Sequence, residues 1–381
     1  MKKVAGGILA AKGFKAGSAE AGVKAAGGLD LGIVWCETPG ATAAIFTQNS
    51  ILAAPVQLSQ PHAKNRDARA IVVNSGNANC MTGEEGKLHA GQMIRDTAKL
   101  LGIDEAKVLV ASTGIIGKPL PIDKVLDGIQ AAFGKAASSS AAADDFAQAI
   151  TTTDTVIKTA AYECEIGGKT VTIGGCAKGS GMMQPNMATM LAFLTTDAAI
   201  APELLDKALR EAARTTFNSI TVDGMTSTND MLAIMASGQA GNAVIDKENG
   251  AYDTFLEALR QACLDLALMI VRDGEGATIL VTVRVNGAKD YDQAKAIAYE
   301  VANSPLVKTA AHGKTGNWGR IAQAIGKLGL PITEDSLEIQ ADSPSDDQLD
   351  LTITTKLGSA SATVYTCDFS KDYIDINVAY N

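Results

Sequence analysis

One threonine in the middle of the chain has the sequence context of a nucleophile. Residues 174–197 read GGCAKGSGMMQPNMATMLAFLTTD, so a glycine-rich stretch containing Lys178 runs into Ala188 and Thr189 at the start of an apolar segment. Attack of the Thr189 hydroxyl on the Ala188 carbonyl, followed by hydrolysis of the ester, would leave Thr189 with its own α-amine. Such an amine has an ordinary pKa of roughly 7.7–8.0 and can act as general base for the adjacent hydroxyl. The segment indicates either a self-cleaving chain with an N-terminal nucleophile or a buried strand after a glycine-rich loop.

Two other polar segments have the composition of site-forming loops. Residues 111–117, ASTGIIG, follow a predicted strand and offer backbone N–H groups with the Thr113 hydroxyl, which is what an oxyanion hole needs. Residues 151–155, TTTDT, bring hydroxyl groups together ahead of Lys158. Taken alone, the first segment fits an ordinary turn at a strand end and the second fits a threonine-rich strand. Neither identifies a function by itself.

Composition argues against several classes of protein. With 33 Lys and Arg against 42 Asp and Glu the net charge is −9, and aromatic residues are 4% of the 381, which disfavours nucleic-acid and anionic-membrane partners. No apolar run is long enough to span a bilayer. The presence of only three histidines and the absence of GxSxG disfavour a Ser-His-Asp hydrolase. The acidic residues lack the close alternate spacing that a metal-binding loop needs. The six scattered cysteines predict reduced core thiols in a cytoplasmic protein.

Apolar periodicity predicts the elements that must hold these segments. Strands and helices interleave without a strict βαβ order, which indicates a mixed α/β protein built of layers. The stretch 135–145 is expected to be a surface loop or the lead-in to a helix. The expected strands are 68–73, 108–111, 170–174, 190–195, 231–236, 278–285, 337–340, 351–355, 362–368 and 373–378. The expected helices are 87–101, 122–133, 202–214, 254–270, 289–302 and 317–327.

Short motifs along nearly the whole chain carry a family resemblance. KGSGMM at 178–183, followed by PNMATMLAFLTTDA at 185–198, is the most specific of them. The others include AGVK at 21–24, VNSGNAN at 73–79, STGIIG at 112–117, TTDT at 152–155, TVDG and TSTND within 221–230, RDGEGAT at 272–278, SPLVKTA at 304–310 and CDFSKDY at 367–373. In this order they resemble the ornithine acetyltransferase family, also called bifunctional glutamate N-acetyltransferase / amino-acid acetyltransferase, of arginine biosynthesis. The resemblance favours the nucleophile over the plain strand as the interpretation of Thr189.

The resemblance implies a fold and a processing event. The family fold is a layered helix–sheet–sheet–helix sandwich, similar to N-terminal-nucleophile hydrolases but with different connectivity. Cleavage between Ala188 and Thr189 would give an α chain, residues 1–188, and a β chain, residues 189–381. The two chains are expected to stay intertwined in one catalytic unit and to assemble as α2β2.

The resemblance also implies an activity and its residues. Acetyl would pass from N2-acetylornithine to glutamate through an ester on Thr189, without a cofactor, and in some members acetyl-CoA also serves as donor. Thr113 and Gly114 match the oxyanion pair. The positions that match substrate-binding residues are Thr152, Lys178, Thr189, Glu275 and Asn377. No metal, nucleic acid or membrane is expected as a partner.

Two alternatives to acetyl transfer stay open at this point. An aminopeptidase or amidase would use the same nucleophile with water as acceptor, although Lys178 and Glu275 argue against it. A family member with an altered substrate or without activity is the other alternative. It is motivated by departures from the family pattern, such as Met225 in place of an acid and Thr315-Gly316 in place of Asp-Pro.

Overall fold

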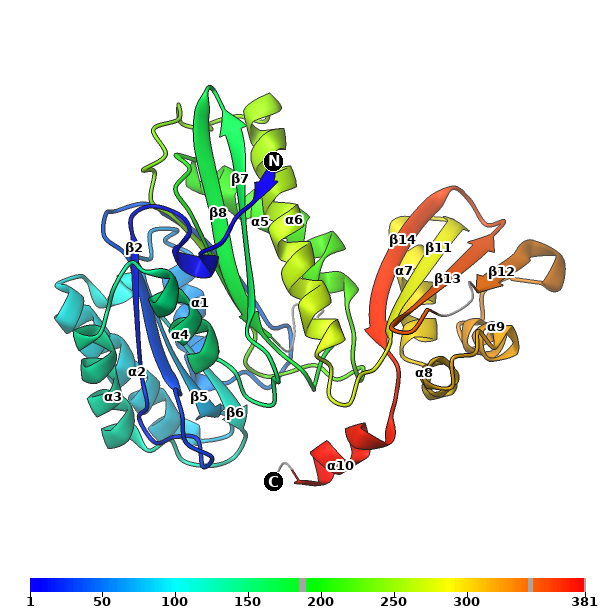
Figure 1. Ribbon diagram of the computed structural model, residues 1–381, viewed down its shortest axis with the longest axis horizontal. Coiled ribbons are helices and arrows are strands. Elements are labelled where there is room, and N and C mark those ends of the chain that lie inside the picture. The colour runs from blue at the N-terminus through cyan, green and yellow to red at the C-terminus, as the bar shows by residue number, and fades with distance from the viewer. Residues whose placement is uncertain (185–189, 342–344, 380–381) are drawn as a thin grey trace. The chain divides into compact units, whose positions relative to one another are not determined.

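The strands and helices gather into two compact units (Figure 1). The computed structural model describes residues 1–184, 190–341 and 345–379. In these residues the first unit holds two sheets and the second unit holds one. The first unit comprises Met1–Gly179, Asn186–Thr216 and Thr226–Leu266, and the second comprises Ser180–Pro185, Phe217–Met225 and Ala267–Asn381.

One sheet of the first unit has six strands in the order β1-β7-β8-β9-β10-β4. β9 and β10 are parallel, and the other neighbours are antiparallel. Every residue of β9 (Leu191–Thr196) and β10 (Met231–Ala236) is buried, as expected for strands covered on both faces. The remaining strands are β1 (Lys2–Lys3), β4 (Ala41–Phe46), β7 (Lys158–Ile166) and β8 (Lys169–Lys178).

The other sheet of this unit has the order β2-β3-β5-β6, with β5 parallel to β6 and the other neighbours antiparallel. Side chains alternate between its faces, because Ile71 and Val73 join one apolar cluster while Ala70 and Val72 join another. The first of these clusters also contains Phe193 of β9, so this face packs on the six-stranded sheet. The bounds are β2 (Phe14–Ala19), β3 (Leu31–Cys36), β5 (Ala70–Asn77) and β6 (Val108–Ile115).

Helices cover the outer faces of these two sheets (Figure 1). α2 and α3 bury their apolar residues against the four-stranded sheet. On the other side α5 packs on β4, and α6 is joined to β7 by the Tyr162 hydroxyl, which donates to Asp265 at 2.7 Å. The predicted layered sandwich is therefore confirmed for the first unit. The helices are α1 (Ala54–Ala63), α2 (Gly83–Leu101), α3 (Ile122–Gly134), α4 (Ser140–Ala149), α5 (Pro202–Thr215) and α6 (Gly250–Arg272), which continues into the second unit.

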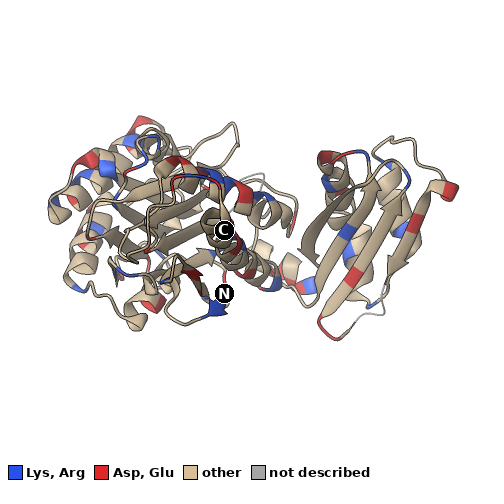
Figure 2. Ribbon diagram, turned by 90° about the horizontal axis from the view of Figure 1, so that it is seen from above, with Lys and Arg blue, Asp and Glu red and all other residues tan. Residues whose placement is uncertain are grey.

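The second unit has one sheet, in the order β12-β13-β11-β14. Its buried face, which includes Val283, Leu351 and Val364, packs on three helices. The opposite face carries charge of both signs, as Figure 2 shows, including the pair of Arg284 and Asp350 at 3.0 Å. The elements are β11 (Leu280–Ala288), α7 (Tyr291–Ala302), α8 (Pro305–His312), α9 (Trp318–Gly326), β12 (Leu337–Ala341), β13 (Gln348–Thr355), β14 (Ala360–Cys367) and α10 (Lys371–Ala379).

One predicted strand is corrected by the structure, and one predicted lead-in to a helix is observed. The segment 373–378, predicted as a strand from its alternation, lies in helix α10, where the Asn377 amide donates to the Tyr373 carbonyl oxygen one turn earlier at 2.9 Å. None of the α10 residues is buried, so the alternation does not mark a sheet face. Within the stretch 135–145, expected to be a surface loop or the lead-in to a helix, residues 135–139 lead into α4, which Ser139 caps by accepting the Ala142 N–H.

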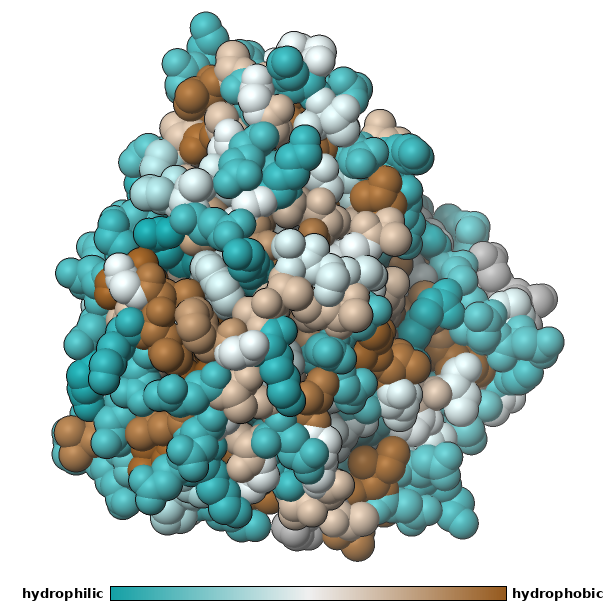
Figure 3. Space-filling model, turned by 60° about the vertical axis from the view of Figure 1, so that its left-hand side comes forward, coloured by the Kyte–Doolittle hydropathy of each residue, from teal (hydrophilic) through white to brown (hydrophobic). Residues whose placement is uncertain are grey.

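The described residues also bear on the membrane and cysteine predictions. No helix within them is long and apolar enough to cross a membrane. All six cysteines lie in the described ranges, and each is buried and unpaired. On the side of the molecule seen in Figure 3, apolar surface is divided into patches by hydrophilic side chains. Scattered exposed apolar residues of this kind are ordinary on a folded protein.

Candidate active site

The predicted oxyanion pair lies at the end of β6. In the parallel pairing of β5 with β6, Gly76 is the partner of Gly114. Gly114 has φ of 132°, and a Cβ there would lie 2.3 Å from the Gly76 carbonyl carbon. Only glycine fits such a position, since any side chain would meet backbone at less than contact distance. The strand end that carries Thr113 is therefore held close to β5.

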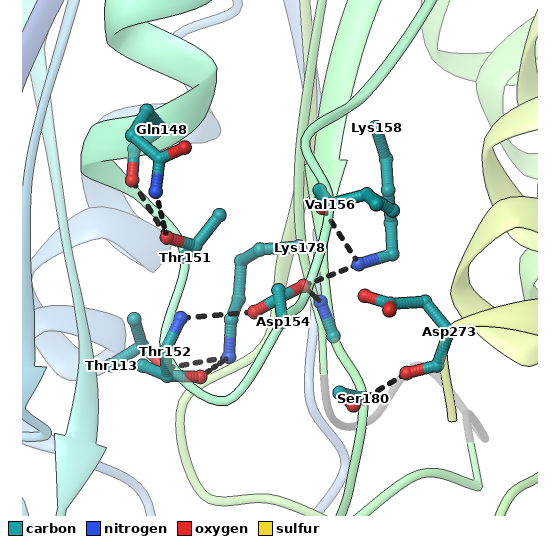
Figure 4. A network of polar contacts seen from close by, with 11 residues as sticks. Thr113, Gln148, Thr151, Thr152, Asp154, Val156, Lys158, Lys178, Ser180 and Asp273 are labelled. Carbon is teal, nitrogen blue, oxygen red and sulfur yellow. Dashed lines mark hydrogen bonds and ion pairs between the residues drawn. The ribbon is translucent and has the colours of Figure 1, made fainter. Parts of the chain in front are cut away.

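Lys178 brings two of the predicted site residues together (Figure 4). It is the last residue of β8 and is 8% exposed. Its ammonium donates to the Thr152 hydroxyl at 2.6 Å and to the Thr113 hydroxyl at 3.3 Å. One ammonium and two hydroxyl groups at the end of a buried strand form a set of donors suited to a carboxylate.

A buried carboxylate that the sequence analysis did not single out supports this arrangement. Asp154 forms an ion pair with Lys158 at 2.6 Å, and both side chains are fully buried. Asp154 also accepts the backbone N–H groups of Thr152 at 2.9 Å and Gly179 at 2.7 Å. It thus binds both the Thr152 backbone and the residue after Lys178 (Figure 4). The segment 151–155 is a connection between α4 and β7, so the strand expected there is a wrong prediction.

The charge on Asp154 is maintained by its neighbours. Burial alone would raise the pKa of its carboxyl, but the ammonium groups of Lys178 and Lys158 and the Gly179 amide together lower the pKa to about 2. The carboxylate is therefore ionised at neutral pH and balances the two lysines.

The chain that follows the predicted nucleophile enters the sheet beside Lys178. Ala188 and Thr189 lie outside the described residues, so the structure leaves the nucleophile prediction untested. Leu191, the first residue of β9, is the antiparallel partner of Lys178. Met190 is buried, and its carbonyl oxygen accepts the Met231 N–H at 3.1 Å.

Asp230 lies just before β10, whose first residue, Met231, is the parallel partner of Leu191. Asp230 is 3% exposed, and among the described residues its Oδ2 has no hydrogen-bond partner. Burial raises the pKa of this carboxyl well above its ordinary value, against the effects of the Met190 amide, the Lys178 ammonium and the Ser227 hydroxyl. A buried carboxyl beside the first residues of β9 is a further titratable group of this region. The TSTND motif contained it, but only the strand pairing places it.

Two predicted substrate residues belong to the second unit. Glu275 is 8% exposed, and its carboxylate accepts the Asn377 amide of α10 at 2.8 Å. A Cβ at Gly181 would lie 2.4 Å from the Glu275 carboxyl carbon, so the backbone there packs directly on the carboxylate. The structure thus joins Glu275 with Asn377, as it joins Thr113 and Thr152 with Lys178.

The KGSGMM segment is anchored in the second unit after Gly179. The Ser180 hydroxyl donates to the Asp273 carbonyl oxygen at 2.6 Å. Asp223, from the TVDG motif, accepts the N–H groups of Met182 at 2.6 Å and Met183 at 2.7 Å. The motif is therefore fixed on both sides of its glycine-rich part. Among the described residues no group of His, Cys, Asp and Glu is arranged to hold a metal ion.

Comparison with known proteins gives the family. The model of the ArgJ family matches residues 15–346. The "Arginine biosynthesis bifunctional protein ArgJ" of Bacillus subtilis is 43% identical, covering 99% of this chain and 97% of that protein. Ornithine acetyltransferase of Mycobacterium tuberculosis, solved with ornithine, is 36% identical with a TM-score of 0.46, covering 49% of this chain and 98% of that chain. The L-aminopeptidase D-Ala-esterase/amidase of Ochrobactrum anthropi is described as a variant of the Ntn-hydrolase fold. It is 13% identical with a TM-score of 0.41, and the match covers 70% of this chain and 87% of that chain.

The family model spans most of the chain, and the Bacillus subtilis relative is similar over nearly the full length of both chains. This chain belongs to the ArgJ family.

Proposed function

We propose that this chain is a self-cleaving acetyltransferase that moves acetyl from N2-acetylornithine to glutamate through Thr189. The observation that carries the proposal is the simultaneous contact of the Lys178 ammonium with the hydroxyl groups of Thr152 and Thr113. Both substrates carry an α-carboxylate, which the Lys178 ammonium and the Thr152 hydroxyl can hold by charge-assisted hydrogen bonds beside Thr113 of the candidate oxyanion hole. Family membership and the ArgJ name of the curated relatives support the same activity.

The position of Lys178 also supports Thr189 as the nucleophile. Thr189 precedes Leu191 by two residues, and Leu191 is the partner of Lys178 across the sheet. Cleavage before Thr189 would therefore create the new α-amine in a segment that leads into β9 opposite an ammonium group. A neighbouring positive charge disfavours protonation of an amine, which keeps it available as a base.

The proposed transfer balances without a cofactor. The Thr189 oxygen attacks the acetyl carbonyl of N2-acetylornithine, the C–N bond breaks, and ornithine leaves with the proton that the α-amine has taken. The amine of glutamate then attacks the ester and gives a proton to the Thr189 α-amine, the C–O bond breaks, and this proton passes to the Thr189 oxygen and restores the hydroxyl. We propose that N–H groups at Thr113 and Gly114 stabilise the oxyanion in both steps. Glu275, bound by Asn377, is assigned to the ammonium of ornithine.

The sheet explains why the cleaved chains would remain together. β9 and β10 follow the proposed cut, yet they lie between β8 and β4, which precede it. Separation of the α and β chains would break hydrogen bonds on both sides of this pair and expose strands that are wholly buried. We further propose an α2β2 assembly in the cytoplasm, where the six unpaired cysteines would stay reduced.

A product assay tests this function. Purified protein is incubated with N2-acetylornithine with and without glutamate, and with acetyl-CoA and glutamate in a separate reaction. Acetylglutamate that appears only when glutamate is present supports the proposal. Free acetate at an equal rate without glutamate would indicate an amidase, and absence of both products would indicate an inactive family member. The acetyl-CoA reaction decides whether a second donor is used.

A further inference from the structure

Lys24, in the AGVK motif, has no role in the function proposed so far. It lies in the loop between β2 and β3, where Asp30 is fully buried and its carboxylate accepts three backbone N–H groups of the loop. The Asp30 carboxylate accepts the N–H groups of Ala21 at 2.6 Å, Val23 at 2.6 Å and Lys24 at 3.0 Å. The backbone of Lys24 is therefore fixed by the fold.

This loop lies against the strand pair that carries the candidate oxyanion hole. Gly76 has φ of 96°, and a Cβ there would lie 3.0 Å from the Lys24 backbone nitrogen and 3.1 Å from its Cγ. Gly76 in turn is the β-partner of Gly114. Lys24 thus packs on the end of β5, and β5 packs on the residue next to Thr113.

The charge of Lys24 is incompletely balanced by the protein. Its ammonium donates to the neutral Leu29 carbonyl oxygen at 2.7 Å. Burial lowers its pKa, the carboxylates of Asp30 and Asp154 raise it, and the Lys178 ammonium lowers it, with a net lowering. Both carboxylates are already engaged, Asp30 by backbone amides and Asp154 by Lys158. A carboxylate from a ligand would supply the missing negative charge.

We propose that Lys24 binds the side-chain carboxylate of the acceptor, so that Lys178 and Lys24 together select a dicarboxylic amino acid. This inference rests on the function proposed above. Glutamate has a second carboxylate for Lys24, whereas the side chain of N2-acetylornithine carries an ammonium that Lys24 would repel. A site that binds two amino acids in turn can distinguish them with one cation, which attracts the side-chain carboxylate of glutamate and repels the side-chain ammonium of ornithine.

The test compares Lys24→Met with Lys24→Arg in the cleaved protein that contains both the α and the β chain. Glutamate, its neutral analogue glutamine, and labelled ornithine each serve as acceptor from the acetylated enzyme. Lys24→Met should lower kcat/KM for glutamate by about ten- to a hundredfold, mainly through KM, because one hydrogen bond between charged groups is lost. The value for glutamine should change little, the value for ornithine should rise because its ammonium is no longer repelled, and Lys24→Arg should retain the preference for glutamate.

Lys124→Met is the matched control. Lys124 reaches the same loop, since its ammonium donates to the Gly22 carbonyl oxygen at 3.4 Å, but the contact is exposed. Acetylation of each variant by N2-acetylornithine alone shows whether it is folded and cleaved. An unchanged glutamate-to-glutamine ratio in an acetylated Lys24→Met enzyme would overturn the inference and leave the proposed function intact. Wild-type protein that transfers no acetyl would instead overturn the function.

Discussion

Each unit of the molecule contains a fully buried lysine, and the two ammonium groups have different hydrogen-bond acceptors. Lys158 in the first unit is paired with the Asp154 carboxylate at 2.6 Å, and both are fully buried. Lys308 in the second unit is 1% exposed and donates to neutral oxygens, the Thr366 hydroxyl at 2.8 Å and the Cys367 carbonyl. Burial lowers the pKa of Lys308, although the nearby Cys367, Asp368 and Asp223 act in the opposite direction.

The difference follows from what each lysine adjoins. Asp154 binds the Thr152 backbone and Gly179 as well as Lys158, so the ion pair is part of the network around Lys178. Lys308 instead binds the end of β14, close to the chain that leads to α10, and its ammonium lies 4.5 Å from the centre of the Phe369 ring. A full buried charge pair is used where the fold must hold further charged groups in place. Neutral acceptors suffice for Lys308, which holds a hydroxyl and a backbone carbonyl at the end of β14.

The largest effect is expected from Asp154→Leu. Removing one partner of a buried ion pair leaves the Lys158 ammonium uncompensated, and the free energy of unfolding should fall by roughly 3–5 kcal/mol. Urea unfolding at neutral pH measures the change.

The double variant Asp154→Leu/Lys158→Met separates the roles of this pair. It should recover most of the stability, because no buried charge is left alone, but transfer activity should stay low since Thr152 and Gly179 lose their shared acceptor. Full activity in the double variant would show that the pair does not position the Lys178 network.

The contribution of the Asp154 carboxylate should also appear in the pH dependence of the free energy of unfolding, with a smaller effect than that of Asp154→Leu. The folded pKa of Asp154 is about 2, below the ordinary 3.8, so its stabilisation is complete above about pH 4 and is lost as the pH falls through 2. The shift corresponds to about 2 kcal/mol. The difference in unfolding free energy between wild type and Asp154→Asn should therefore narrow by about this amount from pH 4 to pH 2. A constant difference would mean that Asp154 titrates alike in both states.

Lys308→Met should have the smallest effect at neutral pH, on the order of 1 kcal/mol, because it removes hydrogen bonds to neutral acceptors and strands no carboxylate partner. The lowered pKa of Lys308 means that the unfolded chain binds its proton more tightly, so wild-type stability should rise with pH toward the ordinary pKa of 10.5. The variant should lack this rise. A loss as large as that of Asp154→Leu would contradict the distinction between the two lysines.

The sequence predicted the regular elements better than the contacts between them. The strand expected at 231–236 has the bounds of β10, and the helix expected at 202–214 is α5 to within one residue, since both depend on local apolar patterns. α10 was mistaken because its alternating residues are exposed and bury no face. Thr113 and Lys178 are 65 residues apart, and only the sheet topology brings their side chains together.

The roles of the buried and partly buried charged side chains were the least predictable part of the site. Asp154 stood within the TTDT motif, but its role depends on Lys158 at the start of β7 and on Gly179 just after β8. Asp230 and Lys24 were likewise present in motifs without an assigned task. Residue type alone does not show that the carboxylates of Asp154 and Asp230 are buried and that Lys24 is partly buried, and this burial is a cause of the perturbed pKa of each group.

Intact-mass analysis of the purified protein before and after incubation with N2-acetylornithine shows whether Thr189 is the nucleophile of both cleavage and transfer. We expect two species, residues 1–188 and residues 189–381, with the second gaining one acetyl group at Thr189 that glutamate then removes. Thr189→Ala should remain a single unacetylated species. A wild-type preparation that stays full-length, or that turns over N2-acetylornithine with glutamate while Thr189 is never acetylated, would contradict the account.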